Sequence, residues 1–279
     1  MQNSSTKITV IKAKKNPFGI DFRELSEYRE LLYFFVWRDI KVKYKQTLLG
    51  VLWAILVPAA QMLIFTFLFA NLAQLPTNGV PPSLWYLSGL TLWAYFSTVL
   101  NQASNSLISN SAFLTKVYFP RVLIPLSPAF SALIDFAIAS LALLILILAL
   151  GQSISITILL FPISLFITLL TALVVGYFFA AANVRYRDVR YLLPILTQLW
   201  MFLSVIYPYS QISHNLLLKK IYGLNPMLVA VETFRWSLFP GSGEFPLELI
   251  IYALPISIII FVLGLHYFKI TERTFADII

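Results

Sequence analysis

The sequence has no cysteine and few charged residues. Asp, Glu, Lys and Arg together make up 11% of its 279 residues. The lack of cysteine excludes a disulfide framework, a thiolate metal site and a cysteine nucleophile. A soluble domain carries about 25% charged residues, so this chain has too few polar side chains to cover a surface that faces water. We therefore expect an all-α polytopic membrane protein.

Catalytic and nucleotide-binding motifs are also missing. The sequence contains no GxxxxGK[ST] phosphate loop, no HExxH motif and no cluster of metal ligands. We expect a chain that is not an enzyme, binds no metal or cofactor, and would leave any ATP and Mg²⁺ to a separate subunit. The net charge of +8 does not indicate nucleic acid, because the basic residues are distributed by loop and form no stripe with stacking platforms.

What the sequence does have is a series of hydrophobic runs. Each is long enough to cross the roughly 30 Å hydrocarbon core as a helix. Six transmembrane helices are predicted, at about Thr47–Leu72, Leu84–Leu107, Val122–Leu150, Ile156–Ala182, Val189–Tyr209 and Leu247–Phe268. We therefore expect residues 47–268 to form the transmembrane domain and residues 269–279 a cytoplasmic tail.

Lys and Arg residues alternate between the loops. Ten of the twenty precede Gly50, and seventeen fall on one side of a six-span arrangement against three on the other. Cytoplasmic loops carry the excess of Lys and Arg. The pattern predicts that both termini are cytoplasmic.

The N-terminal region precedes the first span. Residues 1–20 are basic and polar without an apolar run, which favours a flexible cytoplasmic tail over a cleaved signal peptide. Residues 21–46 predict an amphipathic helix, because Leu25, Tyr28, Leu32, Phe35 and Val36 recur at helical spacing and a basic stripe follows. Such a helix can lie in the membrane interface. Packing against a partner is the alternative.

The segment between the fifth and sixth spans is apolar but too short to form another span. Asn225-Pro226 predicts a helix start, and Pro240-Gly241 predicts its end. The helix between them would either enter the outer leaflet as a re-entrant element or form a short extracellular lid. The sequence leaves both open.

Two polar or small-residue features lie inside the spans. Ala172, Gly176 and Ala180 form a small-xxx-small row that permits close helix packing. Asp135 is the one acidic residue well inside a span, with no basic partner evident in the sequence. A structural role, neutral or hydrogen-bonded, and a proton-relay role both remain possible for it.

Aromatic residues form two stripes at heptad spacing. Tyr86 and Trp93, flanked by Phe96, lie in the second span, and Trp200 and Tyr207 lie in the fifth. They either pack in the core and at the interface or line a wet passage in which a sugar can slide along aromatic faces.

Four stretches together resemble one known family: WRDIKVKYKQTLLGVLWAILVP (Trp37–Pro58), KVYFPRVLIPLS (Lys116–Ser127), NVRYRDVRYLLPILTQLWMFLSVIYP (Asn183–Pro208) and LNPMLVAVETFRWSLF (Leu224–Phe239). In this order they are similar to the permease subunit of ABC-2 type exporters. The branch they resemble carries polyprenyl-linked polysaccharides such as O-antigen and teichoic acid across the bacterial inner (plasma) membrane.

The resemblance implies a homodimer that works with two ATP-binding subunits, a lipid-linked glycan and membrane lipids. It implies three groups of site residues: an ATPase-coupling group (Asn110, Phe113, Leu114, Lys116 and Arg121, with Arg38, Asp39 and Lys41 from the N-terminal helix), the aromatic stripes as passage lining, and an outer gate that includes Pro226, Phe234 and Arg235. The alternatives are an ABC-2 exporter of drugs or lipids, a proton-coupled carrier using Asp135, and a membrane enzyme, which would need a polar catalytic loop.

Overall fold

The computed structural model describes residues 22–45, 50–116, 118–186, 188–209, 216–243, 245–272 and 275. Within these ranges every regular element is a helix, which agrees with the predicted all-α fold. The tail predicted over residues 1–20 and the end of the predicted C-terminal tail, residues 276–279, lie outside the described residues.

Five helical segments are long and apolar enough to cross a membrane. They are Gly50–Leu72 (η1, Gly50–Leu52; α3, Trp53–Phe65; the π-helix η2, Thr66–Leu72), α6 (Leu123–Ala149), Ile156–Arg185 (η3, Ile156–Leu160; α7, Phe161–Arg185), Val189–Ile206 (α8, Val189–Met201; the π-helix η4, Phe202–Ile206) and α11 (Leu247–Thr271). Each matches a predicted span to within three residues at its described ends. The last span continues three residues into the predicted tail.

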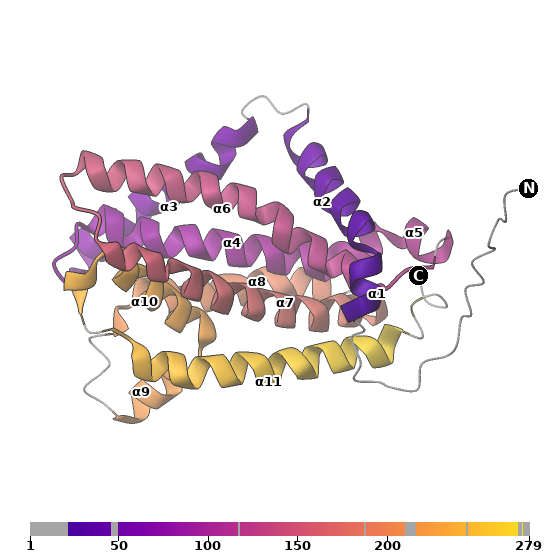
Figure 1. The fold of residues 1–279 in the computed structure, drawn as a ribbon. Coiled ribbons are helices and arrows are strands. Elements are labelled where there is room, and N and C mark those ends of the chain that lie inside the picture. Colours follow the sequence, from indigo (N-terminus) through magenta and orange to yellow (C-terminus); the bar gives the residue numbers. More distant parts are fainter. Residues whose placement is uncertain are drawn as a thin grey trace, which may run out of the picture.

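The predicted second span is α4 (Pro82–Ser109), which is not among the five most apolar segments. Its 28 residues would extend about 42 Å, enough to cross a bilayer. Figure 1 shows α4 in the middle of the bundle, beside α6 and α7. Because protein covers it, α4 can carry buried Ser88, Thr91 and Ser104, and the hydroxyls of Ser88 and Ser104 donate to carbonyls of their own helix. A helix that contacts little lipid needs less hydropathy.

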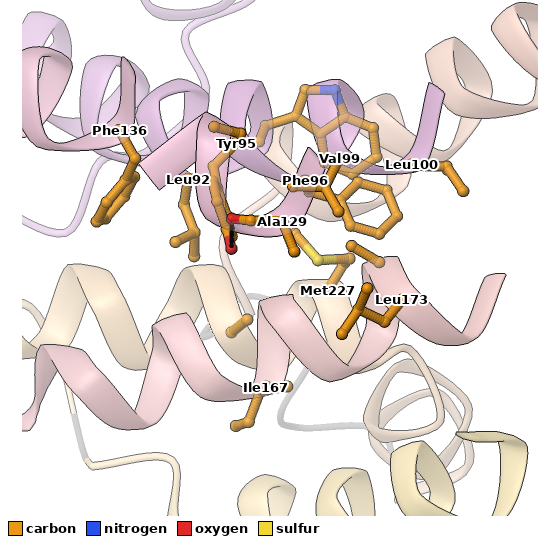
Figure 2. Close-up of a cluster of buried hydrophobic side chains, with 14 of the residues drawn as sticks. Leu92, Tyr95, Phe96, Val99, Leu100, Ala129, Phe136, Ile167, Leu173 and Met227 are labelled. Atoms are coloured by element: carbon orange, nitrogen blue, oxygen red, sulfur yellow. Dashed lines mark hydrogen bonds between the residues drawn. The ribbon is translucent and has the colours of Figure 1, made fainter. Parts of the chain in front are cut away.

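The core lies where α4 packs on α6, α7 and α10 (Pro226–Leu238). Figure 2 shows Leu92, Phe96 and Val99 of α4 together with Ala129 of α6 and Met227 of α10. All five are at most 1% exposed. The hydroxyl of Tyr95 donates to the carbonyl of Ala129 over 3.1 Å, so this buried hydroxyl has a partner on the neighbouring helix.

The small-residue row on α7 is buried against α4. Ala172 and Ala180 are fully buried, and a Cβ placed on Gly176 would lie 2.9 Å from the Cβ of Ala103. The opposite side of α7 is equally close to α11, since a Cβ on Gly264 would lie 2.8 Å from the Val174 carbonyl oxygen. Glycine at these two positions sets the spacing of three helices.

The two ends of the bundle differ in charge. At one end, which we call the basic end, lie α1 (Phe22–Glu27), α5 (Ser111–Lys116), the start of α6 and the ends of α7 and α11 (Figure 1). Its basic residues include Lys116, Arg121, Arg185, Arg190 and Lys269. The opposite end carries α9 (Leu216–Gly223), α10 and η6 (Pro240–Ser242). The loops predicted to share one side of the membrane therefore share one end of the structure.

The N-terminal helix divides into α1 and α2 (Arg29–Tyr44), and α2 leans against α6 (Figure 1). Phe35 is buried and the other predicted apolar positions are half-buried, so the predicted stripe faces the bundle. Tyr33, Phe34 and Trp37 are nevertheless exposed on other sides of the helix. The apolar surface is thus wider than the single stripe that the sequence predicts.

Candidate functional site

The predicted coupling segment α5 packs against α2 at the basic end. Phe35 is the centre of the contact, with Phe113 at 5.9 Å in an edge-to-face arrangement and Phe119 at 5.8 Å between ring centroids. Phe119 and Leu114 are buried, whereas Phe113 remains 40% exposed. Phe113 can therefore hold α5 on the bundle with one edge and offer the other to a partner.

A polar network joins α2 to the end of α4 and the start of α6. Arg38 donates to the Asn110 side-chain oxygen and pairs with Asp39 at 2.7 Å. Asp39 also accepts from the hydroxyl of Ser127 at 2.9 Å. Four side chains from three elements thus bond to one another and link α2 to the end of α4 and the start of α6.

The remaining predicted coupling residues lie outside this network. Lys116 is exposed, and Lys41 projects over the ring of Trp37 at 5.0 Å. Arg121 donates to the carbonyl of Glu272 at 2.7 Å, which fixes the end of α11 to the start of α6. The structure therefore brings Arg38, Asp39, Asn110, Phe113 and Leu114 together and places Arg121 against the C-terminal segment.

Asp135 has a basic partner that the sequence did not reveal. Its carboxylate contacts both Lys43 and Tyr44, at the end of α2 and more than ninety positions earlier in the chain. Burial, followed by the hydrogen bond to Asp135 and its negative charge, raises the pKa of Tyr44 above its ordinary value. The partner comes from outside the predicted spans, because the N-terminal helix α2 packs along α6.

A cavity of about 670 Å³, lined mainly by polar and charged residues, opens between α2, α4 and α6. Its wall on α4 is almost entirely amides and hydroxyls, and its wall on α2 carries two cations and one carboxylate. The lining residues are Arg38, Asp39, Val42, Lys43, Asn101, Gln102, Asn105, Ser106, Ser109, Asn110, Ser127 and Pro128. Sequence reasoning did not single out this site, although the polar run NQASNS at residues 101–106 marks the face of α4 that forms it.

The two aromatic stripes meet inside the chain. Trp200 lies 5.0 Å from Phe96 and 6.5 Å from Trp93, and Phe65 of α3 lies 6.2 Å from Tyr86. Tyr86, Trp93 and Phe96 are at most 4% exposed. In the single chain these three rings therefore have the packing role that the sequence left open beside passage lining.

Trp200 and Tyr207 have more open surroundings. Trp200 borders a mostly apolar cavity of about 460 Å³ between α7, α8, α10 and α11, and Tyr207 is 39% exposed. The Trp200 indole also donates to the side-chain oxygen of Asn225 at 2.8 Å. Of the five predicted ring residues, these two face space that a ligand or a second chain can occupy.

Asn225 starts α10 as predicted, and its side chain does more than cap the helix. Its oxygen accepts from the backbone N–H groups of Met227 and Leu228, and its amide nitrogen donates to Ser204 at 2.9 Å. With the Trp200 bond, one side chain joins α8, η4 and α10. Almost all of α10 is buried, so the structure places it within the bundle and not as a lid on its surface.

The predicted gate residues are parts of this buried helix. Pro226 and Phe234 are buried, and Arg235 is only 1% exposed. The Arg235 guanidinium donates to Glu232 at 3.1 Å and to the Val205 carbonyl at 2.6 Å, and lies 4.1 Å from the centroid of the Trp85 ring. The sequence indicated only a basic residue on a short helix, and tertiary packing made it a buried cation.

Comparison with known proteins agrees with this architecture. Residues 30–239 match the family described as ABC-2 type transporter. The chain is 32% identical to the O-antigen export system permease protein RfbA of Myxococcus xanthus, over 76% of this chain and 82% of that protein. It is 24% identical to RfbA of Klebsiella pneumoniae (87% and 92% covered) and 25% identical to the polysialic acid transport protein KpsM of Escherichia coli (73% and 79%).

Proposed function

Because this chain belongs to the ABC-2 type transporter family, we propose that it is the membrane subunit of a bacterial exporter for a lipid-linked polysaccharide. The observation that carries the proposal is the similarity, over 76% of this chain, to a permease named for O-antigen export. A second relative is named for polysialic acid transport. Both of these cargoes are long hydrophilic glycans. The membrane that the glycan crosses in this proposal is the inner (plasma) membrane.

ATP is hydrolysed by a separate subunit in this proposal. The chain itself binds no nucleotide, cofactor or metal, and ATP with Mg²⁺ lies on two copies of an ABC ATP-binding partner. The basic end of the bundle faces the cytoplasm with both termini, as the Lys and Arg distribution favours. The ATP-binding partner then docks on α5, where Phe113 is partly exposed. Phe113 also packs on Phe35 of α2, and α2 is hydrogen-bonded to the end of α4 and the start of α6.

A glycan passage needs more than one copy of the chain. Each unpaired sugar hydroxyl in hydrocarbon costs about 4–8 kcal/mol, so the glycan must cross in a polar or wet passage. Within the described residues, Tyr86, Trp93 and Phe96 pack closely in the single chain. A homodimer, the commonest symmetric assembly, can form the passage between its subunits, where Tyr207 is already exposed.

Reconstitution with an ATP-binding subunit tests this proposal. The complex is placed in liposomes with a lipid-linked glycan on one leaflet, and ATP-dependent appearance of glycan on the other is measured. We expect transport with ATP and none with a hydrolysis-deficient ATPase. Transport driven by a proton gradient without the ATPase would contradict the proposal and favour a carrier that uses Asp135. ATP-dependent movement of drugs or free lipids without glycan movement would instead favour an ABC-2 exporter of drugs or lipids.

A further inference from the structure

The polar cavity between α2, α4 and α6 has unused hydrogen-bonding capacity. Gln102 is exposed on its wall and bonds to no described residue. Asn101, which also lines the cavity, donates its amide nitrogen to the Ser97 carbonyl at 2.7 Å, and its side-chain oxygen accepts from no described donor. Both groups suit a ligand with hydroxyls, because an amide both donates and accepts.

The cavity also has cationic donors to spare. Arg38 and Lys43 line it, and each pairs with one carboxylate, Asp39 and Asp135 respectively. Three of the five Arg38 N–H donors are used, two on Asp39 and one on Asn110. Lys43 pairs with Asp135 and yet its side chain is 43% exposed, so two of its three ammonium protons are available. Charge-assisted bonds of this kind are the ones that hold phosphate oxygens.

The position of the cavity suits a ligand that enters from the membrane. From Asn110, at the basic end, to Asn101 the wall runs nine residues along α4, about 14 Å. Lys43 meets α6 at Asp135, twelve residues from the start of that 27-residue helix. Lys43, one member of this ion pair, lines the cavity, and ionisable groups so far along a spanning helix are tolerated where they face a water-filled cavity. Val42, 73% exposed, forms an apolar rim on α2.

The geometry points to this cavity as the binding site for the headgroup of the lipid-linked substrate. The phosphates bind Arg38 and Lys43, the first sugar contacts Asn101 and Gln102, and the lipid tail leaves past Val42 into the membrane. A volume of about 670 Å³ falls within the roughly 300–1,000 Å³ of small-molecule sites. This inference rests on the proposed export of a lipid-linked glycan and adds where its headgroup binds before transport.

Two variants remove two of the proposed contacts, those of Gln102 and Lys43, without leaving a buried charge. Gln102→Leu removes an exposed side chain that bonds to no described residue. Lys43→Met combined with Asp135→Leu removes the cation together with its partner, because removing one member of such a pair would strand the other. Arg190→Met is the matched control. Arg190 is an exposed cation at the basic end; it contacts Tyr191 and does not line the cavity.

The experiment uses the full chain with its ATP-binding subunit in phosphatidylcholine nanodiscs. The probe is a polyprenyl diphosphate that carries one sugar, with phosphatidylglycerol as the comparison ligand, and bound lipid is measured by native mass spectrometry. A lost hydrogen bond to a charged group corresponds to about a tenfold weaker affinity or more. We expect at least this loss for the double variant, a smaller loss for Gln102→Leu and none for Arg190→Met, with phosphatidylglycerol binding unchanged throughout.

Two results would overturn the assignment. Wild-type affinity in both cavity variants would mean that the headgroup binds elsewhere. An equal loss of phosphatidylglycerol binding would make the cavity a general anionic-lipid site. ATP-dependent glycan export by the wild-type complex is measured on the same preparation. This measurement tests the proposed function independently of the proposed binding site. If export is observed and the variants bind normally, only the site is wrong.

Discussion

The strongest single perturbation that the structure indicates is replacement of Arg235 by methionine. Arg235 is 1% exposed, donates to Glu232 and to the Val205 carbonyl, and lies against Trp85. Methionine preserves much of the side-chain length but removes every donor. The Glu232 carboxylate and the Val205 carbonyl would then lose their partner in a buried site.

The expected loss is large. Breaking a buried ion pair by removing one partner destabilises a protein by about 3–5 kcal/mol, and the cation–π contact adds up to about 2 kcal/mol where it is desolvated. The ion-pair and cation–π contributions come from the same guanidinium, so their free energies do not add fully. At about 2–4 °C per kcal/mol for chains of this size, Arg235→Met should lower the apparent Tm by roughly 10 °C.

The measurement is thermal unfolding of the purified protein in one detergent at one heating rate, because the apparent Tm of a protein that unfolds irreversibly depends on the heating rate. Arg235→Met combined with Glu232→Leu should recover at least half of the loss, because no unpaired charge remains. Arg235→Lys should recover little of the lost Tm, because a single ammonium group replaces the branched guanidinium that donates to two acceptors. An Arg235→Met protein that melts within about 2 °C of wild type would refute this account.

Three further predictions concern coupling, helix spacing and the start of α10. Phe113→Ala should lower the Tm slightly, because the ring packs on Phe35 but is 40% exposed, and should reduce ATP-dependent export several-fold in the reconstituted complex. Tyr118→Ala, which removes a 66% exposed ring nearby, should export normally; equal export by both variants would contradict the docking surface. Gly264→Ala forces a Cβ against the α7 backbone and should destabilise by about 1–3 kcal/mol, while Gly241→Ala, with open space around it, should match wild type in the same melting assay. Asn225→Ala should lose about 1–2 kcal/mol with the helix cap and speed amide hydrogen exchange in α10; unchanged exchange would show that the cap contributes nothing.

The spans could be predicted because burial in lipid imposes a composition on the chain. Five predicted spans reappear as long apolar helices with boundaries within three residues. The remaining predicted span, α4, could be found by its length but is less apolar than the other five, because other helices and not lipid surround it. Hydropathy reports the environment of a helix, and a central helix has a different environment from its neighbours.

The site was only partly predictable, because its members come from distant parts of the chain. Phe113 and Arg38 were predicted to act at the same end, and the structure brings their elements together through Phe35 and Asn110. The Lys43 contact with Asp135 joins residues 92 positions apart. No local pattern encodes that separation, and the resemblance to a family did not indicate it.

The sequence by itself determined that the chain is a helical membrane protein, where its long helices run and which loops share one end. Those properties follow from hydropathy and from the placement of Lys and Arg, which act residue by residue. Only the tertiary structure decided that Arg235 is buried, that α10 lies within the bundle, and that a polar cavity opens beside α2. These depend on which helix faces contact one another, and such contacts form between residues that are far apart in the chain.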